Sequence, residues 1–212
     1  MRRTLVVFAI VLGCLGLSTG ADAATLTLTS AGNSIYNGVF MGPYTVTDQN
    51  GNVFDVICDD FVADSYLNET WSVDVHTGDL TGTRFASPSD SYNGVTGAEG
   101  YSMIAWLGQQ LFADPGNADI QYALWHVFSS NAQPLSAAAL TLLNTAYSDH
   151  RNDSIANLVI YTPTGTSCLS GPCPTWPPQE FIAIKTPEPG TLSLIGMGLA
   201  TVVASRRRRR VA

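Results

Sequence analysis

One glutamine of the chain lies among bulky apolar residues of a predicted helix, where a solvated polar side chain is not expected. Gln121 is at the edge of a helical apolar stripe, one turn before Trp125 and two turns before Phe128. Bulky apolar neighbours make such a position partly dry, and a carboxamide there needs hydrogen-bond partners or another use. A helical glutamine is ordinarily a solvated flanking residue, so Gln121 alone does not identify a site.

The cysteines provide a second unusual group. The chain has four cysteines, and an exported protein meets an oxidising compartment. Cys168 and Cys173 lie on a tight, Pro-rich loop, where we expect a disulfide; their spacing does not fit a redox or zinc motif. Removal of a signal peptide that carries Cys14 leaves Cys58 without a partner. Cys58 is then either a buried, inert thiol or a group with a chemical role.

Together these two positions resemble the thioester domains of bacterial surface adhesins. The resemblance rests on Ile57-Cys58 at the end of an expected strand and on the hydrophobic-Gln-x-Ala-hydrophobic-Trp pattern of residues 120–125. In that family the cysteine sulfur attacks the glutamine carbonyl, ammonia leaves and an internal thioester remains. The thioester then acylates an amine once, so the family implies an adhesin rather than an enzyme with turnover.

The resemblance assigns a role to each residue of the two motifs. It implies a crosslink between Cys58 and Gln121, surrounded by Ile57, Ala123 and Trp125. A thiolate is a strong nucleophile, but an amide is inert unless the fold holds both groups in attack geometry. The acidic residues 59 and 60 follow the cysteine, and adjacent carboxylates raise the pKa of a thiol.

Two other functions fit the same residues. A cysteine hydrolase needs a base, and His126 is a candidate beside Cys58, although it points about 140° away from Gln121 around a helix of 3.6 residues per turn. A non-covalent structural or matrix protein of the cell surface needs no reaction at Cys58. The sequence predicts no metal site and no cofactor.

Periodicity predicts the elements that hold these groups. Alternating apolar residues indicate strands, and three-four spacing indicates helices. The expected strands are 25–30, 43–47, 53–58, 71–75, 158–162 and 180–185, with an Asn-Gly hairpin turn at 48–52. Expected helices start near residues 101, 120 and 136; Asp114-Pro115-Gly116 ends the first, and Asp119 is the expected cap of the second. This order predicts an α+β domain over 24–185, a β-rich sandwich or barrel with an inserted helical subdomain.

Composition and charge restrict the class of protein. The chain has 212 residues, 45% hydrophobic and 13% charged, which fits one ordered domain with appendages. Residues 24–187 hold fifteen Asp and Glu against three Lys and Arg. Such an acidic body repels phosphate, so it excludes nucleic acid as a partner.

The first segment has the features of an export signal. A basic start, an apolar run and Ala21-Asp22-Ala23 predict a secretory signal peptide over 1–23, cleaved before Ala24. Lipidation at Cys14, which follows a lipoprotein-like Val-Leu-Gly, is an alternative, as is an uncleaved anchor.

The last segment resembles the PEP-CTERM sorting signal of Gram-negative bacteria. It covers residues 186–212, with Pro187, Glu188 and Pro189, an apolar run over 190–204, and the basic residues Arg206, Arg207, Arg208, Arg209 and Arg210. Fifteen helical residues span roughly 22 Å, so this is a short transmembrane sorting helix with its arginines expected in the cytoplasm. The resemblance implies a transient inner-membrane intermediate, cleavage by an exosortase near Pro-Glu-Pro, and delivery to the cell surface or extracellular matrix.

Overall fold

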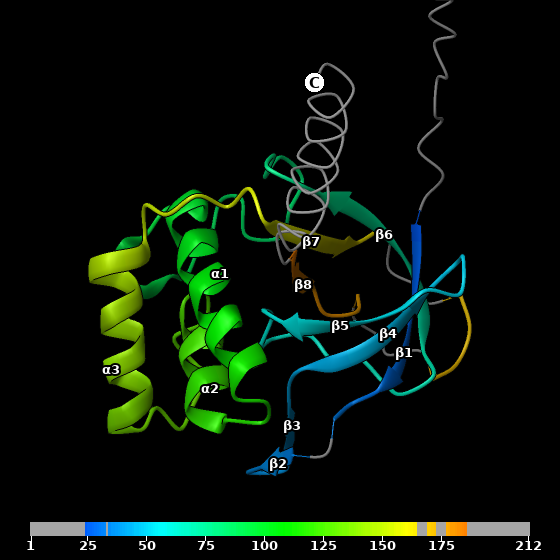
Figure 1. The fold of residues 1–212 in the computed structure, drawn as a ribbon, viewed down its shortest axis with the longest axis horizontal. Coiled ribbons are helices and arrows are strands. Elements are labelled where there is room, and N and C mark those ends of the chain that lie inside the picture. Colours follow the sequence, from blue (N-terminus) through cyan, green and yellow to red (C-terminus); the bar gives the residue numbers. More distant parts are fainter. Residues whose placement is uncertain (1–23, 33, 165–168, 173–176, 186–212) are drawn as a thin grey trace, which may run out of the picture.

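The described part of the chain is a small barrel with a helical layer on one side. The computed structural model describes residues 24–32, 34–164, 169–172 and 177–185. Within them, antiparallel strands close into a barrel in the order β1-β4-β5-β8-β7-β6 (Figure 1). These strands are β1 (Ala24–Ser30), β4 (Tyr44–Asp48), β5 (Val53–Cys58), β6 (Thr70–His76), β7 (Leu158–Pro163) and β8 (Phe181–Ile184). The expected α+β class, with a barrel, is confirmed.

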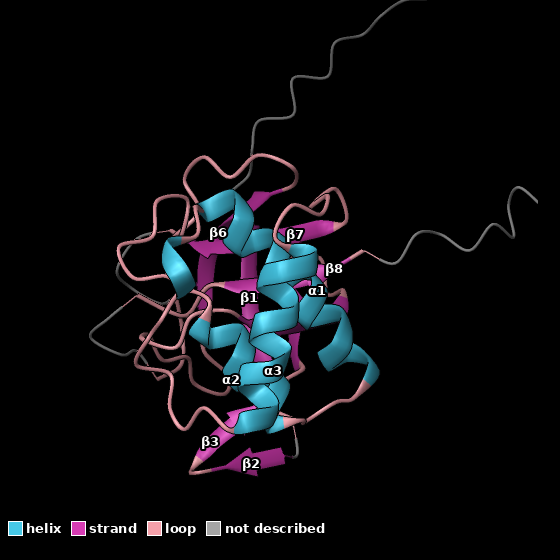
Figure 2. Ribbon diagram, turned by 90° about the vertical axis from the view of Figure 1, so that its left-hand side faces the viewer, coloured by secondary structure: helices cyan, strands magenta, loops and turns pink. Residues whose placement is uncertain are grey.

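The helices form one continuous insertion between β6 and β7. They are α1 (Gly97–Ala113), α2 (Ala118–His126) and α3 (Ala137–Thr145), with a short 3₁₀ turn, η1 (Tyr92–Gly94), before them and a π turn, η2 (Ala146–His150), after them. Seen from the helical side, they lie in front of the barrel (Figure 2). The third helix begins where expected, near residue 136, and its α-helical part ends at Thr145, where the π turn follows.

Large apolar side chains fill the barrel because alternate residues of each strand face inward. Leu26, Val46, Val56 and Trp71 are all buried. The Trp71 ring stacks on Phe181 with 5.7 Å between the ring centroids, which joins β6 to β8 across the interior. Closure of the barrel pairs every one of its strands on both sides, so no barrel strand has a free edge.

The predicted end of the first helix is confirmed, and the predicted cap of the second is wrong. Helix α1 ends at Ala113 with Asp114 as its C-cap, and Gly116 follows with a φ of 79°. The cap of α2 is Asn117, whose side chain accepts hydrogen bonds from the backbone N–H groups of Asp119 and Ile120. Asp119 lies inside the first turn and instead accepts a hydrogen bond from the Ser136 hydroxyl at 2.5 Å. Asn117 is extended, as a cap must be, and Asp119 is already helical.

Helix α1 lies directly on strands β5 and β8. A Cβ placed on Gly108 would be 3.5 Å from Cδ1 of Ile57 and 3.4 Å from Cδ1 of Ile182. Ile57 therefore faces helix α1. Residue 58 points to the other face of β5, because side chains alternate along a strand.

A small hairpin was not predicted. Strands β2 (Ser34–Tyr36) and β3 (Val39–Met41) form a separate two-stranded sheet that projects below the helices in Figure 2. Several of its large apolar side chains are exposed: Ile35, Tyr36, Val39 and Phe40. The Ser34 hydroxyl donates to the Gly116 carbonyl at 3.0 Å, which attaches this hairpin to the turn between α1 and α2.

Several sequence predictions concern residues outside the described part of the chain. The signal peptide at 1–23, the pairing of Cys168 with Cys173 and the sorting helix within 186–212 lie outside the described residues. Among the helices that the structure describes, none has the length and apolar character needed to cross a membrane.

Two glycines of α1 predict opposite effects of the same substitution. A Cβ on Gly100 would lie 2.3 Å from the Phe128 ring, whereas a Cβ on Gly108 makes ordinary contacts. We expect Gly100→Ala to lower the free energy of unfolding by about 1–3 kcal/mol through overpacking. Gly108→Ala should leave it unchanged or raise it by up to about 1 kcal/mol, because alanine favours helix. Urea denaturation of both variants measures this; equal losses would contradict the packing of α1.

Candidate functional site

The side chain of Gln121 is held at the end of strand β5. Its Oε1 accepts a hydrogen bond from the Gly42 backbone N–H at 3.1 Å, and its Nε2 donates to the Cys58 carbonyl at 3.1 Å. These two partners fix the orientation of the amide, because an N–H only donates and a carbonyl only accepts. Gln121 is 0% exposed. The structure thus brings together the two residues that the sequence singled out, 63 positions apart.

The Cys58 thiol is sealed in the same region. Cys58 is unpaired and 0% exposed, and its Sγ donates to the Asp60 carbonyl at 3.1 Å. Burial raises the pKa of the thiol well above its ordinary value, and the neighbouring Asp59 carboxyl raises it further once that carboxyl is ionised. Trp125 and Arg84 oppose this shift. The sequence predicts that acidic neighbours raise the pKa of this thiol, and Asp59 acts in that direction.

Aromatic side chains surround this part of the core. Trp125 is buried, and its ring centroid is 5.3 Å from those of both Phe61 and Tyr122. Its indole N–H makes no hydrogen bond of ordinary geometry. Tyr44 lies near the thiol, since the charge of Cys58 acts on the pKa of the Tyr44 hydroxyl, which burial raises. Water is therefore excluded from the carboxamide and the thiol by large apolar side chains.

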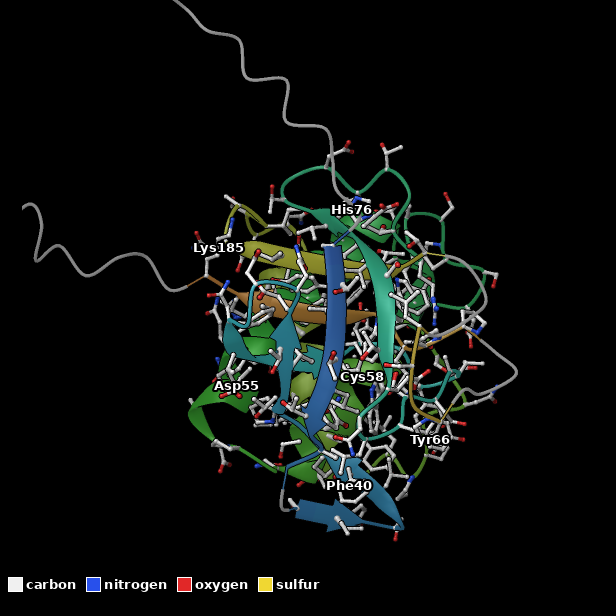
Figure 3. The ribbon with its side chains drawn as sticks, turned by 90° about the vertical axis from the view of Figure 1, so that its right-hand side faces the viewer. Phe40, Asp55, Cys58, Tyr66, His76 and Lys185 are labelled. Atoms are coloured by element: carbon white, nitrogen blue, oxygen red, sulfur yellow. The ribbon has the colours of Figure 1, made fainter. Side chains whose placement is uncertain are left out.

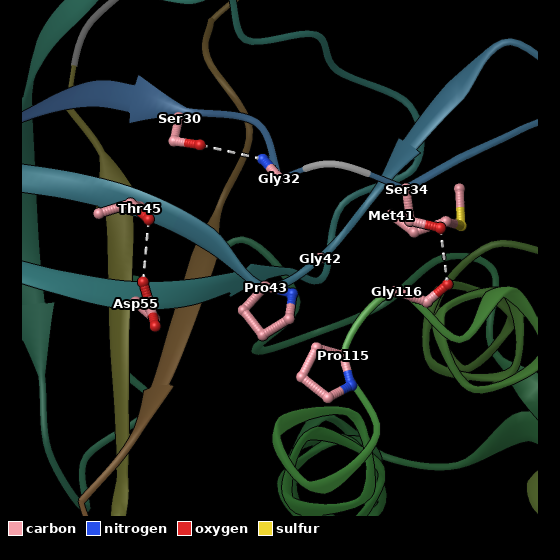
Figure 4. Close-up of a pocket in the computed structure, with 10 residues that line it drawn as sticks. All are labelled: Ser30, Gly32, Ser34, Met41, Gly42, Pro43, Thr45, Asp55, Pro115 and Gly116. Atoms are coloured by element: carbon pink, nitrogen blue, oxygen red, sulfur yellow. Dashed lines mark hydrogen bonds between the residues drawn. The ribbon is translucent and has the colours of Figure 1, made fainter.

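Gly42 connects the site to the turn between the helices. Its carbonyl accepts from the Gly116 N–H at 2.9 Å, and its own N–H reaches Gln121. A Cβ at this position would lie 2.9 Å from Oε1 of Gln121, so only glycine leaves room for the carboxamide. Gly42 also lines an open cavity of about 500 Å³, which we name the glycine groove; it lies between Pro43 and Pro115 (Figure 4).

A group of buried carboxylates supports the strand end next to the thiol. Glu180 is fully buried and accepts hydrogen bonds from the Tyr101 hydroxyl at 2.5 Å, the Arg84 backbone N–H at 2.9 Å and the Thr162 hydroxyl. The Asp59 N–H donates to the Glu180 carbonyl at 3.3 Å. Burial and then the Glu180 charge raise the pKa of the Asp59 carboxyl well above its usual range. Asp59 is therefore neutral under conditions where an exposed aspartate is ionised.

One arginine compensates part of this buried negative charge. The Arg84 guanidinium forms an ion pair with Asp60 and donates to the Pro178 carbonyl at 2.7 Å. Asp60 also accepts from the Val62 N–H at 3.0 Å, which shapes the chain just after the thiol. These contacts fix the Asp60 carbonyl that holds the sulfur. Among the residues that the structure describes, no three His, Cys, Asp or Glu side chains are grouped to hold a metal ion.

The other residues that the sequence singled out make no hydrogen bond to the Cys58 thiol or the Gln121 carboxamide in the described structure. The His126 ring contacts the Ala132 carbonyl at 3.3 Å and packs against Tyr92, while the hydrogen bond of the thiol goes to Asp60. This arrangement offers a hydrolase no Cys58–His126 hydrogen bond. Ala123 is buried on α2, and Ile57 faces α1, so their part in the surroundings of the crosslink stays a prediction.

Sequence reasoning missed the groups that hold the reactive pair. Gly42, Arg84 and Glu180 come from three separate segments, and their roles depend on a backbone N–H, an ion pair and a buried carboxylate. A glycine beside a proline is an ordinary loop signal, so the sequence could not mark Gly42 as a hydrogen-bond donor to Gln121.

Comparison with known proteins bears on the C-terminal segment and on the fold of the domain. A family model described as the PEP-CTERM protein-sorting motif matches residues 185–209, which confirms the predicted sorting signal. Such a motif indicates an exported protein that an exosortase processes at the cell envelope or surface. Among solved structures, the fold is similar to the N-terminal thioester domain of a protein F2 like fibronectin-binding protein from Streptococcus pneumoniae. The two are 13% identical, with a TM-score of 0.44, and the match covers 79% of this chain and 95% of that one. A search of curated proteins finds no match.

The raised pKa of Asp59 predicts a dependence of stability on pH. The folded protein keeps a proton on Asp59 that the unfolded chain releases above about pH 4, so the free energy of unfolding falls as the pH rises from there toward the folded-state pKa. Asp59→Asn removes this titration. The variant should therefore gain stability relative to the native protein as pH rises, by up to about 1.4 kcal/mol per pH unit.

Urea denaturation at several pH values between about 4 and 7 measures the difference. Asp74→Asn, which removes an exposed carboxylate from strand β6, is the matched control. A difference between Asp59→Asn and the native protein that stays constant with pH would contradict the buried, neutral Asp59.

Proposed function

We propose that the exported domain forms an internal thioester between Sγ of Cys58 and Cδ of Gln121, and uses it to attach covalently to an amine outside the cell. One observation carries this proposal. The two polar atoms of the Gln121 carboxamide are bound by Gly42 and by the backbone of Cys58 itself, in a site that excludes water. A structural glutamine also needs its buried polar atoms satisfied; what favours a reaction is that one of the two partners is the cysteine itself.

The first step joins the Cys58 thiol to the carboxamide that the Cys58 backbone carbonyl binds. The sulfur of Cys58 attacks Cδ of Gln121, the S–C bond forms and the C–N bond breaks. The thiol proton leaves with the amide nitrogen as ammonia, so the step needs no co-reactant. Negative charge develops on Oε1 during the attack, where the Gly42 N–H already donates a hydrogen bond. Proximity provides much of the rate, since amides do not react with thiols in dilute solution.

The second step attaches the target. An amine nitrogen attacks the same carbon, the C–N bond forms and the C–S bond breaks, and the sulfur takes up a proton to become a thiol again. The product is an amide between the target and the side chain of Gln121. Because Gln121 is consumed, each protein molecule reacts once, which is adhesion rather than turnover.

The environment of the thiol slows formation of the bond and then preserves it. A raised pKa disfavours the thiolate that attacks the carboxamide. The same raised pKa makes the thiolate a poor leaving group, and the apolar surroundings keep water from the carbonyl. We therefore expect a thioester that resists hydrolysis and reacts when an amine reaches the site. Export and sorting place this chemistry at the cell surface, where an amine-bearing surface or matrix component is the target.

Intact mass of the exported domain tests the crosslink. Residues 24–187, directed to a periplasm and purified, should be lighter than the sequence by one ammonia. Methylamine should restore the mass as an adduct on Gln121 and free the Cys58 thiol for labelling. Cys58→Ala and Gln121→Glu should both show full mass and no adduct. Gln109→Glu, the same change at an exposed position of α1, should behave as the native protein.

Other results of the mass measurement would support one of the two alternative functions. Full mass with a free Cys58 thiol, and no methylamine adduct, would leave a non-covalent surface domain whose thiol is structural. Labelled, reactive Cys58 with catalytic release of a product would instead support a hydrolase.

The hydrogen bond from Gly42 gives a further expectation. A methyl group at residue 42 would press on Oε1 of Gln121 and move the carboxamide. Gly42→Ala should therefore reduce the fraction of molecules that lack ammonia, while circular dichroism shows a folded barrel. A folded Gly42→Ala variant with the full native level of thioester would show that this contact does not position the reacting carbonyl.

A further inference from the structure

A second groove lies against the aromatic side chains of the site. It has a volume of about 330 Å³ and runs between the β2–β3 hairpin and the segment 64–66. We name it the aromatic groove. The residues that line it are Leu28, Ala31, Gly38, Val39, Phe40, Tyr44, Asp64, Ser65, Tyr66, Trp125, Gln179 and Phe181. Phe40 and Tyr66 lie below Cys58 on one face of the molecule (Figure 3).

The floor of the aromatic groove is shared with the Cys58–Gln121 site. Trp125 influences the pKa of the thiol, and Tyr44 is influenced by Cys58. Phe181 is the strand partner of Cys58 in the register of β5 with β8. The buried Trp125 indole N–H acts on the Cys58 thiol and lowers its pKa, although the two make no hydrogen bond of ordinary geometry. The groove and the thiol therefore have Trp125, Tyr44 and Phe181 as common neighbours.

The walls and mouth of the groove differ in character. The rings of Phe40 and Tyr66 are each 44% exposed and give the groove an apolar rim. Asp64 is exposed and is the one charged side chain among the described residues that line the groove. The combination of apolar walls with a single carboxylate is complementary to an alkyl chain that carries one positive charge.

The glycine groove does not offer the same combination. Its carboxylate, Asp55, accepts a hydrogen bond from the Thr45 hydroxyl at 3.0 Å, and its lining is made of small residues and prolines (Figure 4). Asp55 lies on the opposite side of strand β1 from Tyr66 (Figure 3). The two acidic positions therefore form a matched pair for experiment.

We propose that the aromatic groove is the route by which the amine reaches the thioester, and that it selects an ammonium on an unbranched alkyl chain, with Asp64 as a specificity-determining residue. This inference rests on the proposed function. Asp64 attracts the ammonium to the mouth, and the apolar rim packs against the methylenes. The ammonium releases one proton to water before attack; the neutral nitrogen then forms the amide and keeps one of its two protons, and the departing sulfur takes the other.

The test measures how fast different amines consume the thioester, followed by intact mass. The native protein should react faster with n-butylamine than with methylamine, by about fourfold for each methylene that the groove buries. tert-Butylamine should react more slowly than either, because its branched carbon does not fit between the rings. O-Methylhydroxylamine is uncharged at neutral pH. It therefore measures the reactivity of the thioester without any attraction between Asp64 and an ammonium group.

Asp64→Asn should slow n-butylamine by about three- to tenfold at low salt, with the difference shrinking as salt is added. It should leave the rate with O-methylhydroxylamine unchanged. Asp55→Asn, the matched loss of one carboxylate, should leave both rates as in the native protein.

The outcomes separate the two proposals. If Asp64→Asn and Asp55→Asn slow the reaction with n-butylamine equally, the effect comes from the overall charge of the protein. That result would overturn the aromatic groove as the route of the amine. Slowing of n-butylamine by Asp55→Asn alone would assign the route to the glycine groove. Indifference of the native protein to chain length and branching would also overturn the inference, while the thioester itself stands. A native protein of full mass that reacts with none of these amines would contradict both.

Discussion

The placement of Gln121 beside Cys58 depends on the two hydrogen bonds of its carboxamide. Gln121 lies on α2, Cys58 ends strand β5 and Gly42 precedes β4, so the bonds from Gly42 to Oε1 and from Nε2 to Cys58 join the helical layer to the barrel. Each bond is buried, so a loss of either partner leaves a polar group unsatisfied and costs about 1–3 kcal/mol. The same contacts that satisfy the glutamine hold its carbonyl beside the cysteine.

Electrostatics around the thiol work against its ionisation. Asp59 and Glu180 lie close together in the core, with Arg84 and Tyr101 as compensating partners. A buried charge is tolerated when it is paired and hydrogen-bonded, and Glu180 has three donors. The cluster fixes the strand ends of β5 and β8 and thereby the Asp60 carbonyl that binds the sulfur. These contacts fix the position of the thiol and disfavour its ionisation.

The sequence predicted what depends on local pattern. Alternation located the barrel strands, Asp48 closes the expected hairpin by accepting from the N–H groups of Asn50 and Asn52, and the Asp-Pro-Gly stop of α1 is confirmed. The prediction of the N-cap of α2 failed because Asn117 and Asp119 are both good capping residues. The turn at Gly116 leaves Asn117 extended at the start of the helix. The β2–β3 hairpin escaped because its apolar residues are exposed at a short turn and show no buried face.

The reactive pair could be chosen from the sequence only because Cys58 and Gln121 belong to recognisable motifs. Their supports could not, since a backbone donor such as Gly42 leaves no mark on residue type, and Arg84 and Glu180 meet across 96 positions. Those contacts exist only after the barrel closes. Local pattern thus singled out Cys58 and Gln121 as candidates, and the tertiary structure shows which groups hold them.

A crystal structure of the exported domain, grown without amines, tests the central claim most directly. Our account predicts continuous electron density from Sγ of Cys58 to Cδ of Gln121, no density for Nε2, and the Gly42 N–H still donating to Oε1. Separate density for a thiol and an intact carboxamide, with the amide nitrogen bound to the Cys58 carbonyl, would show that the fold holds this pair without joining it.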